Sequence, residues 1–388
     1  MREVALAAGI VVVLANWASM IATIVLPRGR TRAQRLTWSL TWAVHRVAVA
    51  VSRLSADYAR RDALLAAVAP AAVVVQLVSF LGLFIVGYAL MLLPWSQQLG
   101  AAFDQAGAGA VTLGLARAAG HTNDAIVVLA AASGAITVAL QIGYLPVLYQ
   151  SFARRETLVA LMESRAGVPA WGPEVLIRHQ LVHTTDALGD FYKAWELWAA
   201  DVAESHSTHP VLLLFRSPVA GYSWLLSLLA VLDAAAIQLA VNPASAPSEA
   251  RLCLRMGFSA LRRIAQTLNI AYNDDPRPDD PIALSPAEFA DALGQLERIG
   301  FPLERTAAEA WPHFAGWRVN YEQIAYRLAD AIVAPQAPWS GMRRHLRVET
   351  VLPRRPPHRS PDGAVVADDA ARAGSWPPPS SREIASKG

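Results

Sequence analysis

Residues 65–94, LAAVAPAAVVVQLVSFLGLFIVGYALMLLP, decide the fold class because this long run contains no charged side chain. About 20 apolar residues in a helix cross the ~30 Å hydrocarbon layer of a bilayer, so this run is long enough to span a membrane with some tilt. The whole chain agrees with this interpretation, since 54% of its 388 residues are hydrophobic and only 17% are charged. An ordinary soluble domain is less apolar and more charged.

Two further runs have the same character. Residues 4–26 hold no charge and predict a helix of roughly 34 Å. This run is longer than the 7–15 apolar residues of a signal peptide, so we expect it to be retained as a span. Residues 125–150 predict a third span. Trp95, just after the second run, is the type of residue that lies at a lipid–water boundary.

The arginines predict the orientation. The segment 27–64 is strongly basic, and Arg154 and Arg155 follow the third span, so the positive-inside rule places both regions in the cytoplasm. The basic residues of the first segment are Arg28, Arg30, Arg32, Arg35, Arg46, Arg53, Arg60 and Arg61. We therefore expect a multi-pass protein of the plasma membrane with its N-terminus outside. The amphipathic part of this segment lies along the inner leaflet or forms a solvated connector.

Between the second and third spans lies GAGAVTLGLARAAGHTND, residues 107–124. The preceding SQQLGAAFDQAGAGAV predicts a short helix, and a Thr-x-Gly string and a polar return follow it. Span, short helix, Thr-x-Gly string and span is the order of a pore-loop cation channel, in which backbone carbonyls replace the hydration shell of the ion. Irregular backbone at membrane depth is tolerated where it is buried in protein or lines a cavity.

VTLGLA (111–116) and IGYLPVLYQSFARRE (142–156), with ESHSTHPVLLLFRS and SWLLSLLAVLD further on, give the chain a family resemblance. It resembles the two-transmembrane pore-loop potassium channel superfamily over roughly residues 60–265. The resemblance implies a homotetramer that conducts potassium or another monovalent cation, with no other cofactor. It also implies a filter backbone made of Thr112, Leu113, Gly114, Leu115 and Ala116, with Arg117 at the outer mouth.

Three residues depart from the filter pattern of that superfamily. Ala116 replaces a glycine, Leu115 replaces an aromatic residue, and Arg117 stands where an acidic residue often attracts cations. These departures leave an alternative open, a non-conducting membrane scaffold or sensor with a decayed pore loop.

Within the third span, Gly134 is a possible gating hinge and Gly143 a second candidate, although close packing through small residues is the role we favour. Pro146 either kinks this helix or ends it.

The sequence after the third span changes to amphipathic helical patterns. It predicts an all-helical cytoplasmic domain over 151–334, after an N-terminal span and basic linker (1–64) and a pore domain (65–150). Ser285 and Glu288 predict a helix capping box. A Pro-, Arg- and Ser-rich tail (335–388) is expected to be largely disordered.

Residues 222–241 are nearly long enough to span a membrane, but Asp233 near their centre is expensive in lipid. Crossing here would also put the arginines of 251–263 outside. We therefore expect a buried core helix in which Asp233 pairs with Arg216 or Arg255.

The sequence contains no nucleophile–base, phosphate-loop or dinucleotide motif, so we expect neither an enzyme nor a small-molecule substrate. His179 and His183 have the i, i+4 spacing of metal ligands, but surface histidines are the favoured interpretation. His206 and His209 are close in sequence as well. Cys253 is expected to be a buried apolar residue, and the aromatic group Phe191, Tyr192, Trp195 and Trp198 a piece of core. The net charge of +3 does not favour a nucleic-acid partner. The fold expected is thus an all-α membrane protein with three transmembrane helices and a re-entrant pore loop.

Overall fold

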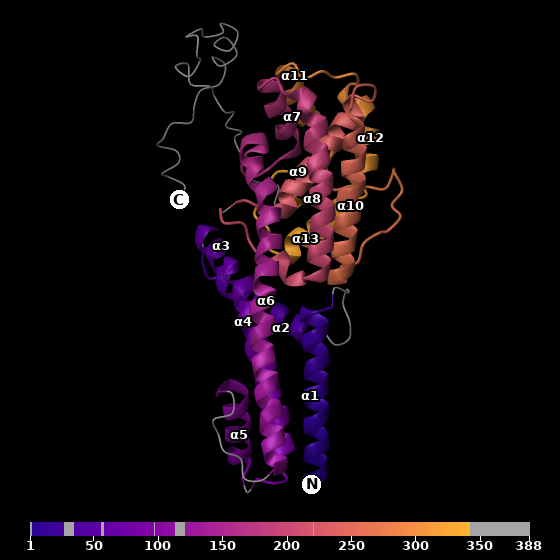
Figure 1. Cartoon of the computed structure of the whole chain (residues 1–388). Helices are drawn as coiled ribbons and strands as arrows, with labels where there is room; N and C mark the ends of the chain where they lie inside the picture. Colours follow the sequence, from indigo (N-terminus) through magenta and orange to yellow (C-terminus); the bar gives the residue numbers. More distant parts are fainter. Residues whose placement is uncertain are drawn as a thin grey trace, which may run out of the picture. The chain divides into compact units, whose positions relative to one another are not determined.

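The computed structural model describes residues 2–26, 35–55, 58–96, 98–112, 121–219 and 221–341, and within these ranges the chain is helical without a strand (Figure 1). The α-helices are α1 (Arg2–Ile24), α2 (Arg35–Ser52), α3 (Tyr58–Ala66), α4 (Val68–Leu92), α5 (Leu99–Thr112), α6 (His121–Ala166), α7 (Gly172–Leu181), α8 (Leu188–Thr208), α9 (Trp224–Val241), α10 (Ser248–Leu268), α11 (Pro286–Arg298), α12 (Ala307–Arg318) and α13 (Glu322–Ala331). Two short 3₁₀ helices, η2 (Thr185–Ala187) and η3 (Pro210–Leu214), flank α8.

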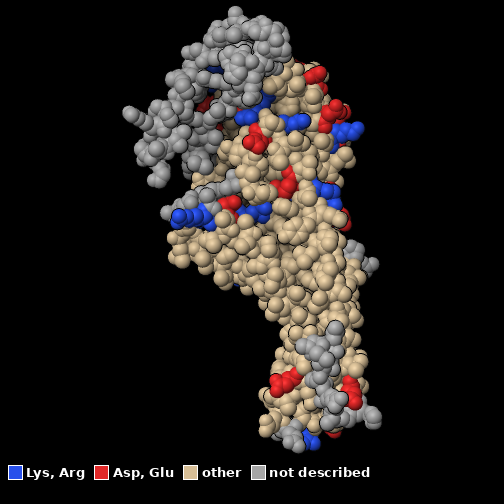
Figure 2. Space-filling view, turned by 60° about the vertical axis from the view of Figure 1, so that its left-hand side comes forward, with Lys and Arg blue, Asp and Glu red and all other residues tan. Residues whose placement is uncertain are grey.

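Four helical stretches among the described residues are long and apolar enough to cross a membrane. They are Arg2–Ile24, Arg60–Leu92, Asn123–Ala166 and Trp224–Val241. The first three contain the spans expected from the sequence. On the face that Figure 2 shows, a broad band of surface without charged residues covers much of the membrane helices, and most of the charged residues lie over the C-terminal helices. The length and composition of these helices are those of a helical membrane protein.

Helices α1 and α4 approach each other closely at two glycines. A Cβ on Gly9 would lie 2.6 Å from the carbonyl oxygen of Gly87, and a Cβ on Gly87 would lie 2.7 Å from Val13 Cγ2. Asn16 on α1 adds a hydrogen bond from its Nδ2 to the carbonyl oxygen of Phe80 on α4, at 2.9 Å. Small residues and buried polar groups are what hold helices together in lipid, where the hydrophobic effect does not drive their association.

Helix α6 is continuous over 46 residues and is therefore roughly 69 Å long. It runs from the membrane region into the C-terminal domain, where it contacts α7, α8 and α9 (Figure 1). Pro146 lies inside it, so the expectation that this proline ends the helix is wrong. A proline removes one hydrogen bond of the helix, and packing on both sides of Pro146 keeps the remaining bonds in register.

Helix α2 packs against other helices on one face and is exposed on the other. His45 is buried and donates from Nε2 to the carbonyl oxygen of Ala331 on α13, at 2.9 Å, while α2 also packs on α4. Val47 and Val51 leave exposed apolar side chains on the other face. Helix α2 is therefore attached to the C-terminal domain.

Helix α9 is the centre of the C-terminal domain, because all of its residues are buried among α6, α7, α8, α10, α12 and α13. The surrounding helices lie close to it at two glycines. A Cβ on Gly172 of α7 would lie 2.5 Å from the Asp233 Cβ, and one on Gly257 of α10 would lie 2.4 Å from Leu232 Cδ2. This enclosure agrees with the expectation of a core helix over 222–241.

Asp233 is paired with Arg318, and both predicted partners are wrong. Arg318 Nη1 lies 2.6 Å from Asp233 Oδ2, and the Tyr321 hydroxyl donates to Asp233 Oδ1 at 2.8 Å. Arg216 pairs instead with Asp62, at 2.6 Å, and Arg255 lies exposed on α10. Arg318 is remote from Asp233 in sequence, so only the packing of α12 against α9 brings them together.

The folded body continues beyond the predicted boundary at 335. Trp339 and Ser340 are buried, and Arg318 Nη2 donates to the carbonyl oxygen of Trp339 at 2.7 Å. Residues 335–341 therefore belong to the C-terminal domain, and the remainder of the predicted tail (342–388) lies outside the described residues. The predicted capping box of Ser285 and Glu288 is confirmed at the start of α11.

We predict that Arg318→Met lowers the free energy of unfolding by about 3–5 kcal/mol, because Asp233 loses its cation while it stays buried. The matched control is Arg263→Met, which removes an ion pair to Glu204 whose two side chains are 51% and 61% exposed. Its expected cost is below about 1 kcal/mol. Denaturant unfolding of the full chain in one detergent measures both, and equal losses in the two variants would contradict the prediction.

Candidate functional site

Helix α5 packs against α6 with almost no space between their backbones. A Cβ on Gly134 of α6 would lie 2.0 Å from the carbonyl oxygen of Ala110 on α5, and one on Gly109 would lie 3.2 Å from that of Val127. Only glycine fits at position 134, because the Ala110 backbone occupies the place of a side chain. Gly134 thus has the packing role that the sequence analysis favoured, and its role as a hinge stays a prediction.

The contact between Ala110 and Gly134 also sets the depth that α5 reaches. Gly134 is thirteen positions beyond His121, or roughly 20 Å along α6 from its first residue. Helix α5 ends two residues after Ala110, at Thr112. The predicted filter residues Leu113, Gly114, Leu115 and Ala116, and Arg117 at the predicted outer mouth, lie outside the described residues.

One face of α6 has no neighbour among the residues that the structure describes. Its exposed residues recur at helical spacing and combine the small Ala132, Ala135, Ala139 and Gly143 with the larger Val128, Ile136, Ile142 and Pro146. A Cβ on Gly143 would meet nothing within 4 Å. The opposite face holds the packed residues, with the Tyr88 hydroxyl of α4 2.8 Å from Ser133 Oγ and Thr137 3.4 Å from Met20 Sδ of α1. Helix α6 is therefore packed on one side and open on the other.

Two buried glutamines in the membrane helices lack hydrogen-bond partners among the described residues. Both amide atoms of Gln141 on α6 and the Nε2 of Gln76 on α4 are unsatisfied, although the residues are only 3% and 5% exposed. Burying an amide without a hydrogen bond costs free energy. The sequence analysis did not single out these residues; the signal that was available is a glutamine within a run of apolar residues.

Arg155 on α6 is fully buried, although the sequence analysis treated it as one of the cationic residues beside the membrane. Its guanidinium donates to the carbonyl oxygens of Leu212 and Phe215, at 2.9 and 2.8 Å, and pairs with Glu156 at 2.7 Å. Burial lowers its pKa, and the Glu156 carboxylate opposes that shift. The side chain therefore attaches α6 to η3.

His206 on α8 completes this cluster, because its Nε2 lies 3.1 Å from Arg155 Nη1. The arginine can only donate, so the imidazole accepts through Nε2 and is neutral, with its proton on Nδ1 beside Ser205 Oγ at 3.0 Å. Burial holds the pKa of His206 well below its usual value, and the Arg155 charge lowers it further.

The favoured interpretation of surface histidines is wrong for His179 and His206, because both are buried. His179 is buried on α7 and donates from Nδ1 to the carbonyl oxygen of Val175 at 2.7 Å, whereas His183 follows the end of the helix with φ +56°. The i, i+4 geometry assumed for this pair is therefore wrong, because α7 ends at Leu181. No group of three or more His, Cys, Asp or Glu residues able to hold a metal occurs in the described part of the chain.

The other groups singled out in the sequence are core. Cys253 is fully buried, and burial raises the pKa of its thiol far above the usual range, so the thiol is not activated. Phe191, Tyr192, Trp195 and Trp198 are buried on α8, with the rings of the two tryptophans 4.6 Å apart. These predictions are confirmed.

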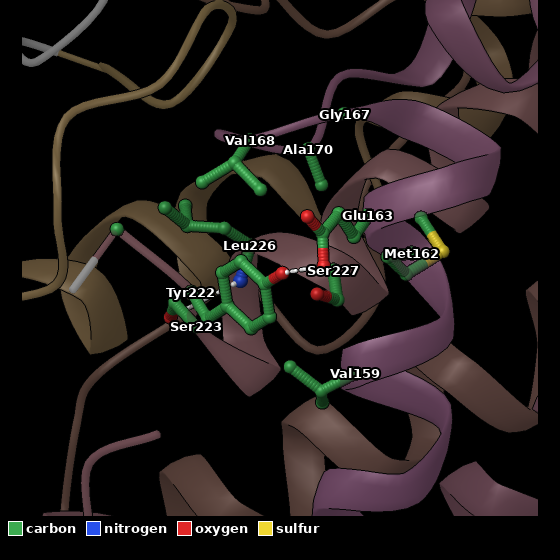
Figure 3. A pocket seen from close by; sticks show the side chains of 11 residues that line it. Val159, Met162, Glu163, Gly167, Val168, Ala170, Tyr222, Ser223, Leu226 and Ser227 are labelled. Atoms are coloured by element: carbon green, nitrogen blue, oxygen red, sulfur yellow. Dashed lines mark hydrogen bonds between the residues drawn. The ribbon is translucent and has the colours of Figure 1, made fainter. Parts of the chain in front are cut away.

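A small pocket lies where α6 leaves the domain core, between Met162, Val168 and Leu226 (Figure 3). Tyr222 crosses it and donates a hydrogen bond to Glu163. Its volume is about 10 Å³, which is room for a single water molecule at most. We therefore assign no ligand to it.

No protein-family model matches the chain, and comparisons with curated proteins and with solved structures found no match either. The potassium-channel resemblance stays a prediction that rests on the sequence strings.

We predict opposite effects on stability for the same substitution at the two glycines of α6. Gly134→Ala forces α5 away and lowers the free energy of unfolding by about 1–3 kcal/mol. Gly143→Ala has open space and raises it by up to roughly 1 kcal/mol, since alanine favours a helix over glycine. Thermal unfolding in one detergent measures both variants. A tolerated alanine at 134 would contradict the close contact with Ala110.

We predict that the protein loses stability as the pH falls below about 6.5. The unfolded chain then protonates His206 while the folded chain keeps it neutral, so the unfolded state binds more protons. Each such proton changes the free energy of unfolding by about 1.4 kcal/mol per pH unit. His206→Gln removes one group that binds a proton only in the unfolded chain. The free energy of unfolding, measured between pH 7.5 and 5.5, should therefore depend less on pH in this variant than in the wild type. An unchanged slope would show that His206 titrates normally in the folded state.

Proposed function

We propose that the protein is a homotetrameric channel for monovalent cations, related to potassium channels, in which α4, α5 and α6 of four subunits surround one axis. Residues 112–116 would supply the filter backbone, and no catalytic activity, cofactor or small-molecule substrate is part of the proposal. The observation that carries it is the depth of α5 in the membrane region.

The ends of α5 and α6 define a chain reversal. Thr112 lies near the level of Gly134, and the chain must reach His121 at the start of α6, roughly 20 Å away. Nine peptide steps span at most about 30 Å, which is enough to cover this distance. A span, a short helix that stops partway and a return to the same end form a re-entrant segment, and such a segment needs protein or a water-filled cavity around it.

The open face of α6 supports an assembly around an axis. Ala132, Ala135, Ala139 and Gly143 lie on the side away from α4 and α5. In a tetramer this face would line the central cavity, with the larger Val128, Ile136 and Ile142 between its small residues. The same helix continues to Arg155 and so connects the pore directly to the C-terminal domain.

Three of the four apolar helices span the membrane in this proposal, and α9 does not. Helix α9 is enclosed on all sides and carries the Asp233–Arg318 pair, whereas α1, α4 and α6 leave apolar side chains exposed to lipid. The bilayer of the plasma membrane is the expected surrounding, with the N-terminus outside. The C-terminal domain is then cytoplasmic, in agreement with the arginines around 27–64.

A second candidate is a non-conducting membrane scaffold or sensor that retains this fold. The residues Leu115, Ala116 and Arg117 favour it, because four arginines around an outer mouth would repel cations. The two candidates share the architecture and differ in whether ions pass.

Ion flux into liposomes separates the two candidates. We expect the reconstituted protein to conduct potassium in preference to sodium, and Arg117→Asp to raise the flux by about tenfold because it turns a repelling ring into an attracting one. The control is Arg277→Asp, which makes the same change of charge at a side chain of the C-terminal domain that is 80% exposed. This control should leave the flux unchanged.

No ion flux through the wild type, together with flux through Arg117→Asp, would mean that the arginine ring blocks an intact pore. If neither the wild type nor Arg117→Asp conducts ions, and native mass spectrometry shows a tetramer, the result would favour the scaffold. A monomer or dimer in mild detergent would contradict the filter ring itself.

A further inference from the structure

A second pocket, of about 50 Å³, lies where the membrane helices meet the C-terminal domain. Its walls come from α1, α2, α4, α6, α8, η3 and α10, so it exists only in the assembled fold. The volume is enough for several water molecules or for a polar group of similar size. The lining is mostly apolar in surface but includes six hydroxyl-bearing residues, Thr23, Thr41, Tyr144, Ser207, Thr208 and Thr267.

Gln76 points to a ligand because it lines this pocket with an unused donor. The residue is 5% exposed, and its Nε2 has no hydrogen-bond partner among the residues that the structure describes. Buried amides are normally satisfied by protein, by water or by a ligand. The group that binds here must therefore accept a hydrogen bond.

The absence of charged side chains in the described lining favours an uncharged binding group. None of the lining residues within the described part of the chain is an Asp, Glu, Lys, Arg or His. A phosphate, a carboxylate or an ammonium group would lose its hydration without gaining a counter-charge, which is strongly unfavourable. Ester carbonyls and hydroxyls are neutral and accept hydrogen bonds, and they suit an amide donor beside several hydroxyls.

The position of the pocket favours a lipid as the source of these groups. Thr23 is the next-to-last residue of α1, and Tyr144 is twenty-three positions into α6, roughly 35 Å from its start. With a hydrocarbon layer of ~30 Å, the pocket lies at the boundary opposite to α5. Leu26, one turn beyond Thr23, is 45% exposed and offers an apolar path beside the pocket.

We propose that this pocket binds the glycerol-ester region of a membrane glycerolipid from the leaflet next to the C-terminal domain. The Gln76 amide donates to an ester carbonyl, and the lining hydroxyls give the glycerol region neutral polar surroundings. The hydroxyls of Thr23, Ser207 and Thr267 already donate within their own helices. The lipid then bridges α1, α2 and α4 to α8 and α10. This inference goes beyond ion conduction and does not depend on it.

The test uses the delipidated full chain in detergent and a diacylglycerol with a photoreactive diazirine close to its glycerol. We expect cross-links to peptides of α1, α2 and α4 that line the pocket, saturating with probe concentration. Gln76→Leu should weaken this labelling about tenfold, the factor that corresponds to one hydrogen bond.

The matched control is Gln141→Leu, because Gln141 is also a buried glutamine with unsatisfied amide atoms but lies outside the pocket. It should label like the wild type. If Gln76→Leu does not fold, Thr208→Trp fills the pocket from a partly exposed position and should abolish the labelling.

Equal labelling of the wild type, Gln76→Leu and Thr208→Trp would overturn the proposal, since it would mean that only the lipid around the helices is labelled. Displacement of the probe by free glycerol as efficiently as by unlabelled dioctanoylglycerol would overturn it too, because the site would then bind a soluble polyol.

Discussion

One uninterrupted helix, α6, is the element on which the rest of the structure depends. Its first half receives α5 at Gly134, α4 at Ser133 and α1 at Thr137, and its second half is held in the C-terminal domain by Arg155. The helix stays continuous although Pro146 removes one of its hydrogen bonds, so it connects the membrane helices to the C-terminal domain without a break. In a channel, such a helix would carry movements of the domain directly to the pore.

Arg155 stabilises the attachment of α6 to the C-terminal domain. A fully buried guanidinium is costly unless all of its donors are used, and here two backbone carbonyls, a carboxylate and a neutral imidazole use them. The carbonyls belong to the turn around η3, which lacks the regular bonds of an α-helix. The arginine therefore stabilises an irregular segment at the point where α6 enters the domain, and neither the segment nor the charge is stable without the other.

The C-terminal domain also buries a charged group, in this case on the apolar helix α9. A helix this apolar would cross a membrane if it were left exposed, but the helices around it cover it completely. The Asp233–Arg318 pair is fully buried beneath these helices. Tyr321 donates to Asp233, and Arg318 also donates to Glu322 and to the carbonyl oxygen of Trp339. A buried pair of this kind specifies how α12 sits on α9 more than it adds stability.

The sequence by itself determined the helical class, the apolar stretches, the capping box at Ser285 and the burial of Cys253, because periodicity, length and local hydrogen bonds are properties of neighbouring residues. It also identified Gly134 as a small residue suited to close packing. It could not supply the partner of Asp233, the buried state of Arg155, the unsatisfied Gln76 or the burial of Trp339 and Ser340. Each of those depends on residues that are far apart in sequence and come together only when the helices pack. The candidate filter stays a matter of sequence, because Leu113 to Arg117 lie outside the described residues, and only the depth of α5 beside them was decided by the tertiary structure.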